Sequence, residues 1–265
     1  MYNQQLIDNL NKAIESHFPL IAKVEEGMNT ARMGVSRLVM LDRYSLKDTA
    51  KLTLTIGDLV VLTVKEDPKW PVRGVGYVKE ILDHKAVIEV EEEYRGAIEN
   101  SQDAESGLVT RDFNSFEKVL EIYYEQIAKR NARGLSEVES PNVRADIQKA
   151  YEQELASSRF VPAGRVLYGA GSGAQVTFFN CYVMPFVPDS RGGIAEHRKH
   201  VMEIMSRGGG VGTNGSALRP KNAPAKGVNG RSSGSVSWLD DIAKLTHLVE
   251  QGGSRRGKKE CVLLR

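Results

Sequence analysis

The chain has 265 residues, of which 41% are hydrophobic and 26% charged, and its formal net charge is +2. That length exceeds the usual size of one domain and allows a sizeable core. The charge is too small to predict binding to a nucleic-acid polymer, and no apolar run reaches the roughly 18 residues of a membrane span. The N-terminus has no basic start followed by an apolar run, so no signal peptide is predicted. We therefore expect a cytoplasmic protein that binds no membrane.

Cysteine and histidine give little support for a metal site. Only Cys181 and Cys261 are present, far apart in the sequence, which excludes a disulfide framework and a four-cysteine zinc site built from this chain alone. His197, His200 and His247 have no metal-ligand spacing with carboxylates or thiols. We expect these histidines on the surface or in packing, and no metal.

In the first half of the chain, apolar residues recur at helical spacing within residues 2–17, which predicts a short amphipathic helix. Residues 52–90 hold four β-rich runs separated by turn residues, which predict a small antiparallel barrel or sheet. The polar segment 94–110 is interpreted as a connector. Helical spacing returns in residues 116–127, and the basic tail and glycine just after them are typical of a helix C-terminus. A further helix is predicted over residues 142–158, where the preceding proline suits a helix start.

The second half is rich in glycine: 17 of the 25 glycines lie after residue 160. They indicate turns and close backbone approaches, and a domain boundary near that residue. The elements predicted after this boundary are, in order, a strand over 175–184, a helix over 192–205, a short apolar segment at 210–213 and a helix over 236–250. This alternation predicts α/β architecture, in which loops at strand ends form ligand sites.

Two glycine-rich stretches leave much backbone unshielded by side chains. FVPAGRVLYGAGSG, residues 160–173, suits close approach to a phosphate or sugar, or it simply connects a helical domain to a sheet. No Lys-Ser/Thr pair follows it, so it is not a P-loop. RGGGVGTN, residues 207–214, exposes amides that suit a ligand, although the pattern alone is a weak signal.

A thiol and two arginines are the remaining candidates. Cys181 lies in the apolar strand TFFNCYVM, either as an inert buried residue or as a redox thiol facing a site. Strand alternation places it with Phe179 and Val183 and opposite Asn180, so only a strand end or a bulge would bring Asn180 and Cys181 to one site. The loop QGGSRRG, residues 251–257, carries two guanidinium groups that grip phosphate or carboxylate, or it is a solvated basic turn.

Four of these segments, taken in order and spacing, resemble the start of the catalytic barrel of ribonucleotide reductase large chains: PAGR, FNCYVMPFVPDS, RGGGVGTNGSALRPKNAPAKG and EQGGSRRG. The resemblance covers about residues 112–257. Two features are similar to the cobalamin-dependent type of the family. One is LDRYSLKD at residues 41–48, followed by a small β unit. The other is PAGR, which stands where iron-dependent members have a serine-proline-threonine pattern.

The resemblance implies a fold and a division of the chain. Residues 161–265 would form the first part of a ten-stranded α/β barrel built from two five-stranded halves. A helical domain at 108–160 and a small β-rich domain with the N-terminal helix at 1–107 would precede it.

The resemblance also implies roles for matching residues. Cys181 matches the first of two thiols that reduce the 2′ position of the substrate and become a disulfide, whereas Cys261 has no assigned role. An effector deoxynucleoside triphosphate would select the substrate base, with Asp189 accepting from its ribose and Arg219 neutralising phosphate. The matching substrate positions are Ala163, Gly164, Asn180, Gly209, Gly210 and Arg255, and the matching effector positions are Asp189, Ser190, Arg219 and Lys226.

The chain departs from the family at its end, where KKECVLLR replaces small and apolar residues. In the family, the radical cysteine and the second reducing thiol lie further downstream. The sequence thus predicts a piece, inactive alone, of a ribonucleoside-diphosphate reductase whose adenosylcobalamin is bound mainly by the C-terminal part. A ribonucleotide substrate, the effector, the remaining reductase chain and a second copy are the expected partners. The alternative is a non-catalytic, truncated or frameshifted remnant that binds nucleotides or a partner chain.

Overall fold

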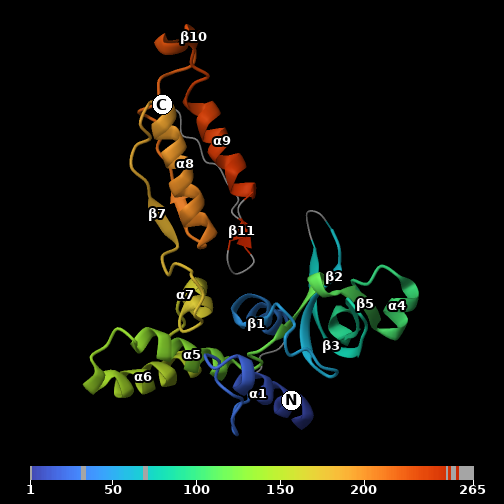
Figure 1. Ribbon diagram of the computed structural model, residues 1–265. Helices are drawn as coiled ribbons and strands as arrows, with labels where there is room; N and C mark the ends of the chain where they lie inside the picture. Colours follow the sequence, from blue (N-terminus) through green and yellow to red (C-terminus); the bar gives the residue numbers. More distant parts are fainter. Residues whose placement is uncertain (1, 31–33, 68–70, 249, 252–254, 257–265) are drawn as a thin grey trace. The chain divides into compact units, whose positions relative to one another are not determined.

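The computed structural model describes residues 2–30, 34–67, 71–248, 250–251 and 255–256 (Figure 1). The chain forms two compact units, Met1–Gly173 and Ala174–Arg265. The boundary expected near residue 160 therefore lies inside the first unit. Among the described residues, no helix is long and apolar enough to span a membrane.

The first unit is built on a six-stranded antiparallel sheet with the order β1-β6-β2-β3-β4-β5. Its strands are β1 (Lys47–Asp48), β2 (Leu59–Lys65), β3 (Val72–Ile81), β4 (Lys85–Val90), β5 (Leu108–Asp112) and β6 (Phe116–Val119). The predicted antiparallel sheet is thus confirmed for its three long strands. Of the four predicted runs, residues 52–55 are not a strand and lie among turns instead.

Strand β2 is buried along almost its whole length because the sheet is covered on both faces. Val60, Leu62 and Val64 pack into one apolar cluster, while Leu59 and Val61 pack into another. A central strand that is covered on both faces has a continuous apolar sequence instead of an alternating one. LVVLTVK has this pattern.

Two sequence predictions in this unit are wrong. The segment 94–110, predicted as a connector, contains α4 (Ser101–Ser106), most of β5 and the end of α3 (Glu92–Arg95). The helix predicted over 116–127 begins as β6, and α5 starts only at Tyr124 and ends at Ser136. Strand β5 pairs with β4, and β6 pairs with β2. Strands on both sides of residue 107 therefore belong to one sheet, whereas the sequence predicted two domains that meet at that residue.

The other predicted helices of this unit are confirmed. The first is α1 (Gln4–His17), whose N-cap Asn3 accepts a hydrogen bond from the Leu6 amide at 2.8 Å. The second is α6 (Pro141–Ala156), which has the proline in its first turn. Three short helices were not predicted from the sequence: α2 (Gly34–Val39), the π-helix η1 (Met40–Tyr44) and α7 (Gly164–Gly169).

Arg130 of α5 forms a buried ion pair and also binds the end of α7. Arg130 Nε lies 2.6 Å from Glu121 Oε1, and both side chains are fully buried. The same guanidinium donates to four carbonyl oxygens, namely those of Tyr44, Leu167, Tyr168 and Ala170. Three of these acceptors lie at the C-terminal end of α7, where carbonyl groups lack partners within the helix. Arg130 therefore caps α7 from outside.

Helix α5 passes through Gly134, where the sequence indicated a helix end. A Cβ atom at Gly134 would lie 2.1 Å from the backbone nitrogen of Gly171, so this glycine serves a close backbone approach and not a helix end.

The second unit follows a strand-helix-strand path. Its elements are β7 (Cys181–Val183), α8 (Arg191–Ser206), β8 (Gly210–Gly212), β9 (Pro224–Ala225), η3 (Lys226–Val228), β10 (Gly230–Arg231), α9 (Ser235–Leu248), β11 (Glu250–Gln251) and β12 (Arg255–Arg256). Strands β7 and β8 are parallel and are connected through α8, and α8 contacts α9. The predicted α/β alternation and both helices are confirmed, although the strand predicted over 175–184 is shorter.

His197 connects α8 to the end of β8. Its side chain is 6% exposed, and its Nε2 lies 3.1 Å from Thr213 Oγ1. Burial lowers the pKa of His197, and the charge of His200, which itself pairs with Glu196, lowers it further.

We therefore expect an acid-sensitive contribution from this residue. Because the folded-state pKa lies below the unfolded value of 6.5, the stabilisation is present above pH 6.5 and is lost as the pH falls through the folded-state pKa. His197→Gln should remove this pH dependence from urea denaturation curves. The control is His84→Gln, whose side chain is 85% exposed. An unchanged pH dependence in His197→Gln would contradict the expectation.

Candidate functional site

The thiol of Cys181 is exposed at the first residue of β7. The interpretation of this residue as an inert buried one is therefore wrong. In the parallel register Cys181 faces Gly210 of β8, and the Gly210 amide donates to the Asn180 carbonyl at 2.7 Å. A Cβ atom at Gly210 would lie 3.8 Å from the Cys181 sulfur. The backbone of β8 thus borders the thiol without a side chain between them.

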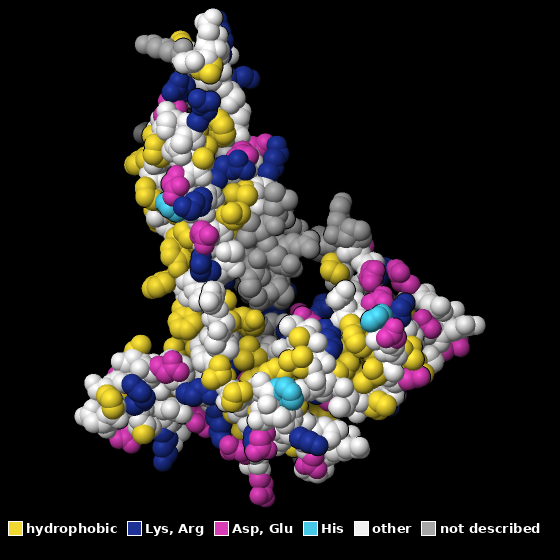
Figure 2. Space-filling model, in the orientation of Figure 1, with side chains coloured by type: hydrophobic (Ala, Val, Ile, Leu, Met, Phe, Trp, Pro, Cys, Tyr) yellow, Lys and Arg dark blue, Asp and Glu magenta, His cyan; other side chains and the backbone are white. Residues whose placement is uncertain are grey.

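The alternation of β7 separates an open face from a packed one. Val183, which shares the face of Cys181 in β7, is 97% exposed. Just before the strand, Phe179 is 71% exposed and its ring lies edge-on to that of Tyr182, with 6.1 Å between the ring centroids, whereas Met184 just after the strand is buried. Figure 2 shows hydrophobic side chains at the surface over β7. Asn180 is also exposed and lies just before the first residue of β7, at the strand end.

The remaining residues predicted to bind the substrate are not placed beside the Cys181 thiol by any described contact. Gly209 is buried, and a Cβ atom there would lie 2.5 Å from Ile204 and 2.8 Å from the Tyr182 ring, so internal packing explains this glycine. Ala163 and Gly164 belong to the first unit, where a Cβ atom on Gly164 would lie 2.9 Å from the Tyr44 ring. The side chain of Arg255 lies outside the described residues.

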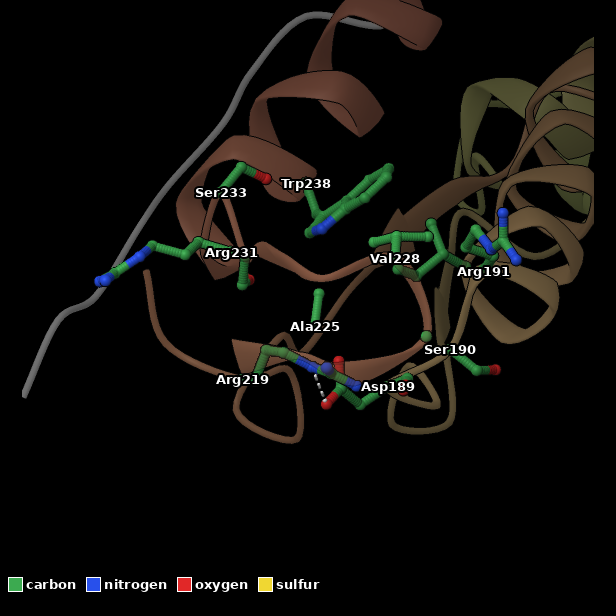
Figure 3. Close-up of a pocket in the computed structure, with 12 residues that line it drawn as sticks. Asp189, Ser190, Arg191, Arg219, Ala225, Val228, Arg231, Ser233 and Trp238 are labelled. Atoms are coloured by element: carbon green, nitrogen blue, oxygen red, sulfur yellow. Dashed lines mark hydrogen bonds and ion pairs between the residues drawn. The ribbon is translucent and has the colours of Figure 1, made fainter. Parts of the chain in front are cut away.

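A pocket of about 430 Å³ brings together three of the four predicted effector residues (Figure 3). Asp189, Ser190 and Arg219 line it, although they lie up to 30 residues apart; the side chain of Lys226 lies outside the described residues. The rest of the lining was not predicted from the sequence and consists of Arg191, Ile194, Ala225, Gly227, Val228, Arg231, Ser232, Ser233 and Trp238.

Asp189 and Arg219 pair with each other within this pocket. Arg219 Nε lies 2.7 Å from Asp189 Oδ2, and its terminal nitrogens donate to the carbonyls of Asp189 at 3.3 Å and Pro224 at 3.1 Å. The side chain of Arg219 is 38% exposed and that of Asp189 is 34% exposed. From the sequence, each of the two residues is expected to bind a different part of the effector.

Two further side chains shape the pocket. Ser190 is the N-cap of α8, and its hydroxyl accepts a hydrogen bond from the Gly193 amide at 3.0 Å. Trp238 of α9 packs against the buried residues Val187, Ile194 and Leu218, and part of its indole stays exposed to the pocket. Figure 3 shows the indole nitrogen on the side of Ala225. The pocket thus combines guanidinium groups, hydroxyls and an aromatic wall, a set that suits a nucleotide.

No group of three or more His, Cys, Asp or Glu side chains within the described part of the chain is arranged to hold a metal ion.

Known proteins provide an independent comparison. Residues 179–264 match the family model for the ribonucleotide reductase barrel domain. Over 114 residues the chain is 36% identical to the vitamin B12-dependent ribonucleoside-diphosphate reductase of Thermoplasma acidophilum, a match that covers 43% of this chain and 14% of that protein.

Two large subunits of ribonucleoside-diphosphate reductase are also similar. The one from Danio rerio is 29% identical over 133 residues, which is 49% of this chain and 17% of the relative. The one from vaccinia virus is 28% identical over 113 residues, a match that covers 42% of this chain and 14% of the viral protein. The matches thus span at most 17% of these relatives. The second unit is therefore similar to the barrel domain of ribonucleotide reductase large chains, as the sequence motifs indicated.

Proposed function

We propose that this chain is the N-terminal part of a ribonucleotide reductase large chain, which makes deoxyribonucleotides from ribonucleotides by radical chemistry. The exposed thiol of Cys181 beside Gly210, inside the segment that matches the barrel domain, is the observation that carries this proposal. The names of the relatives favour ribonucleoside diphosphates as substrates.

Cys181 would supply half of the reducing equivalents. Two thiols give two electrons and two hydrogens: the 2′-hydroxyl leaves as water, C2′ gains a hydrogen, and the two sulfurs join in a disulfide. Cys181 is the one cysteine within the described residues, so the second thiol would come from elsewhere in the full enzyme. An external reductant would then restore both thiols.

We propose adenosylcobalamin as the radical source, because the relative from Thermoplasma acidophilum is named as vitamin B12-dependent. When bound, this cofactor supplies the radical that starts the reaction. The described pockets of about 390 to 430 Å³ lie at the lower end of the range for drug-sized ligands, and a corrin ring with its nucleotide tail is larger. These three pockets are therefore too small for this cofactor, which we expect the rest of the enzyme to bind.

We further propose that the pocket around Asp189 and Arg219 binds a deoxynucleoside triphosphate that selects the substrate base. Three arginines and a tryptophan line it, which provides charge for phosphates and an aromatic surface for a base.

Binding can be measured on the chain itself. The sequence has two tryptophans, so Trp70→Phe leaves Trp238 as the only fluorophore of this kind. We expect its emission to change on titration with thymidine, deoxyguanosine or deoxyadenosine triphosphate, and calorimetry to give the same affinity. If none of the three gives either heat or a fluorescence change, the effector assignment fails. Binding without turnover in the combined enzyme would favour the nucleotide-binding remnant.

A further inference from the structure

Tyr182 follows Cys181 directly in β7, on the opposite face of the strand. Consecutive side chains of a strand point to opposite faces, so the Tyr182 ring is directed away from the exposed thiol. This side chain is half-buried. Its contacts therefore show what supports the thiol from behind.

A side-chain hydrogen bond joins Tyr182 to Thr177. The Tyr182 hydroxyl is hydrogen-bonded to Thr177 Oγ1, and the same oxygen accepts a hydrogen bond from the Phe179 amide at 3.1 Å. We call the bond between the two hydroxyls the Thr177–Tyr182 clasp. It closes a loop over residues 178–181, which include the thiol.

Both ends of the clasp rest on the segment that connects α8 to β8. The Thr177 amide donates to the Arg207 carbonyl at 3.0 Å, at the C-cap of α8. The Tyr182 ring lies against Gly209, where a Cβ atom would come within 2.8 Å of it. Because a side chain at this position would displace the ring, the glycine permits the close approach.

The thiol is held against the next residue of the same segment. The Gly210 amide donates to the Asn180 carbonyl at 2.7 Å, and Gly210 is also the register partner of Cys181. Cys181 thus has a backbone bond to β8 just before it and the Tyr182 ring just after it. Because the thiol itself is exposed, the restraint on its position comes from these neighbours.

The short strand needs such a restraint if its thiol is to react with a bound substrate. Strand β7 has three residues and pairs with β8 alone among the described strands. A reacting group that is displaced by about 1 Å loses about a hundredfold in rate. Reacting side chains are therefore fixed by neighbours that do not touch the substrate themselves.

We infer that Tyr182, through its bond to Thr177, is a positioning residue for the Cys181 thiol in ribonucleotide reduction. The inference rests on the proposed reductase function for the reaction, whereas the restraint on the strand is a property of this chain alone. Neither Tyr182 nor Thr177 was predicted from the sequence to belong to the site.

The kinetic test combines this chain with the C-terminal part of the reductase, adenosylcobalamin, a ribonucleoside diphosphate and an effector. Tyr182→Phe keeps the ring against Gly209 but removes the clasp, and Thr177→Val removes the other hydroxyl. Each should lower kcat about ten- to a hundredfold and leave KM for the ribonucleotide unchanged, because the thiol is misplaced while the substrate still binds.

Three further variants distinguish the clasp from a general effect on packing. Thr177→Ser keeps a hydroxyl and should retain most of the parent kcat. The double variant of Tyr182→Phe and Thr177→Val should be no slower than the slower single variant, because both changes remove the same bond. The matched control is Tyr151→Phe, which removes the hydroxyl of a partly exposed tyrosine in α6 and should turn over like the parent.

Hydrogen exchange followed by NMR tests the restraint on the chain alone. The amides of Thr177 and Gly210 should exchange about two- to tenfold faster in Tyr182→Phe and Thr177→Val, the effect of losing one hydrogen bond. The amide of Met184, which donates to the Gly212 carbonyl at 3.0 Å beyond the clasp, should exchange at the parent rate.

The two measurements separate this inference from the reductase proposal. Parent turnover with an unchanged kcat in Tyr182→Phe would overturn the inference and leave the reductase function standing, as would additive losses in the double variant. A raised KM with the parent kcat would also overturn it, because Tyr182 would then bind substrate. Faster exchange at Thr177 and Gly210 without any parent turnover would refute the reductase function and support the restraint on Cys181.

Discussion

Cys181→Ser is expected to lower deoxynucleotide formation by at least about 10³-fold, because a hydroxyl cannot supply the electrons that a thiol releases on forming a disulfide. The assay combines this chain with the C-terminal part of the reductase, adenosylcobalamin, a ribonucleoside diphosphate and an effector. Because Cys181 does not line the effector pocket, binding of thymidine triphosphate should stay unchanged in the variant.

The control for this substitution is Val183→Thr. Val183 lies on the same open face of β7, two residues away and 97% exposed, and the change likewise introduces a hydroxyl. Its turnover should match that of the parent chain. Substantial turnover by Cys181→Ser would refute a reducing role for this thiol, and absence of turnover in the parent combination would refute the split-enzyme arrangement.

Arg130→Met is expected to destabilise the first unit by about 3–5 kcal/mol, the usual cost of leaving one partner of a buried ion pair without its counter-charge. Glu121 would stay fully buried, and the last carbonyls of α7 would lose their donor. Urea denaturation of the whole chain, followed by circular dichroism, measures the loss.

The matched control is Arg207→Met. Arg207 pairs with Glu203, but their side chains are 50% and 52% exposed. Solvent screens exposed pairs of this kind, so Arg207→Met should cost much less stability than Arg130→Met. Equal losses in the two variants would show that Arg130 and Glu121 do not stabilise α7 as described.

Helices with long apolar periodicity could be predicted from the sequence, whereas short elements could not. In α1 the four buried residues are those at helical spacing, and a 14-residue helix contains several turns of that pattern. In residues 116–127 the apolar residues also recur at helical spacing, yet the segment begins as strand β6. There the pairing of β6 with β2, a contact across more than 50 residues, decides the structure.

The candidate site was predicted in part for the same reason. Motifs identified Asp189, Ser190 and Arg219, and the structure brings them to one pocket. Their ion pair joins residues 30 positions apart and depends on the tertiary fold, so no local pattern indicates it. Arg231 belongs to a polar loop, NGRSSG, whose pairing with Pro224 became visible only in the hairpin.

The exposed apolar side chains in and near β7 have a practical consequence for handling the chain. Phe179, Val183 and Phe186 expose more than half of their side-chain surfaces, and β7 pairs with β8 alone among the described strands. Apolar surface next to a free strand edge promotes self-association. Purified samples should therefore be kept dilute, and a solubilising fusion partner is the sensible choice for expression.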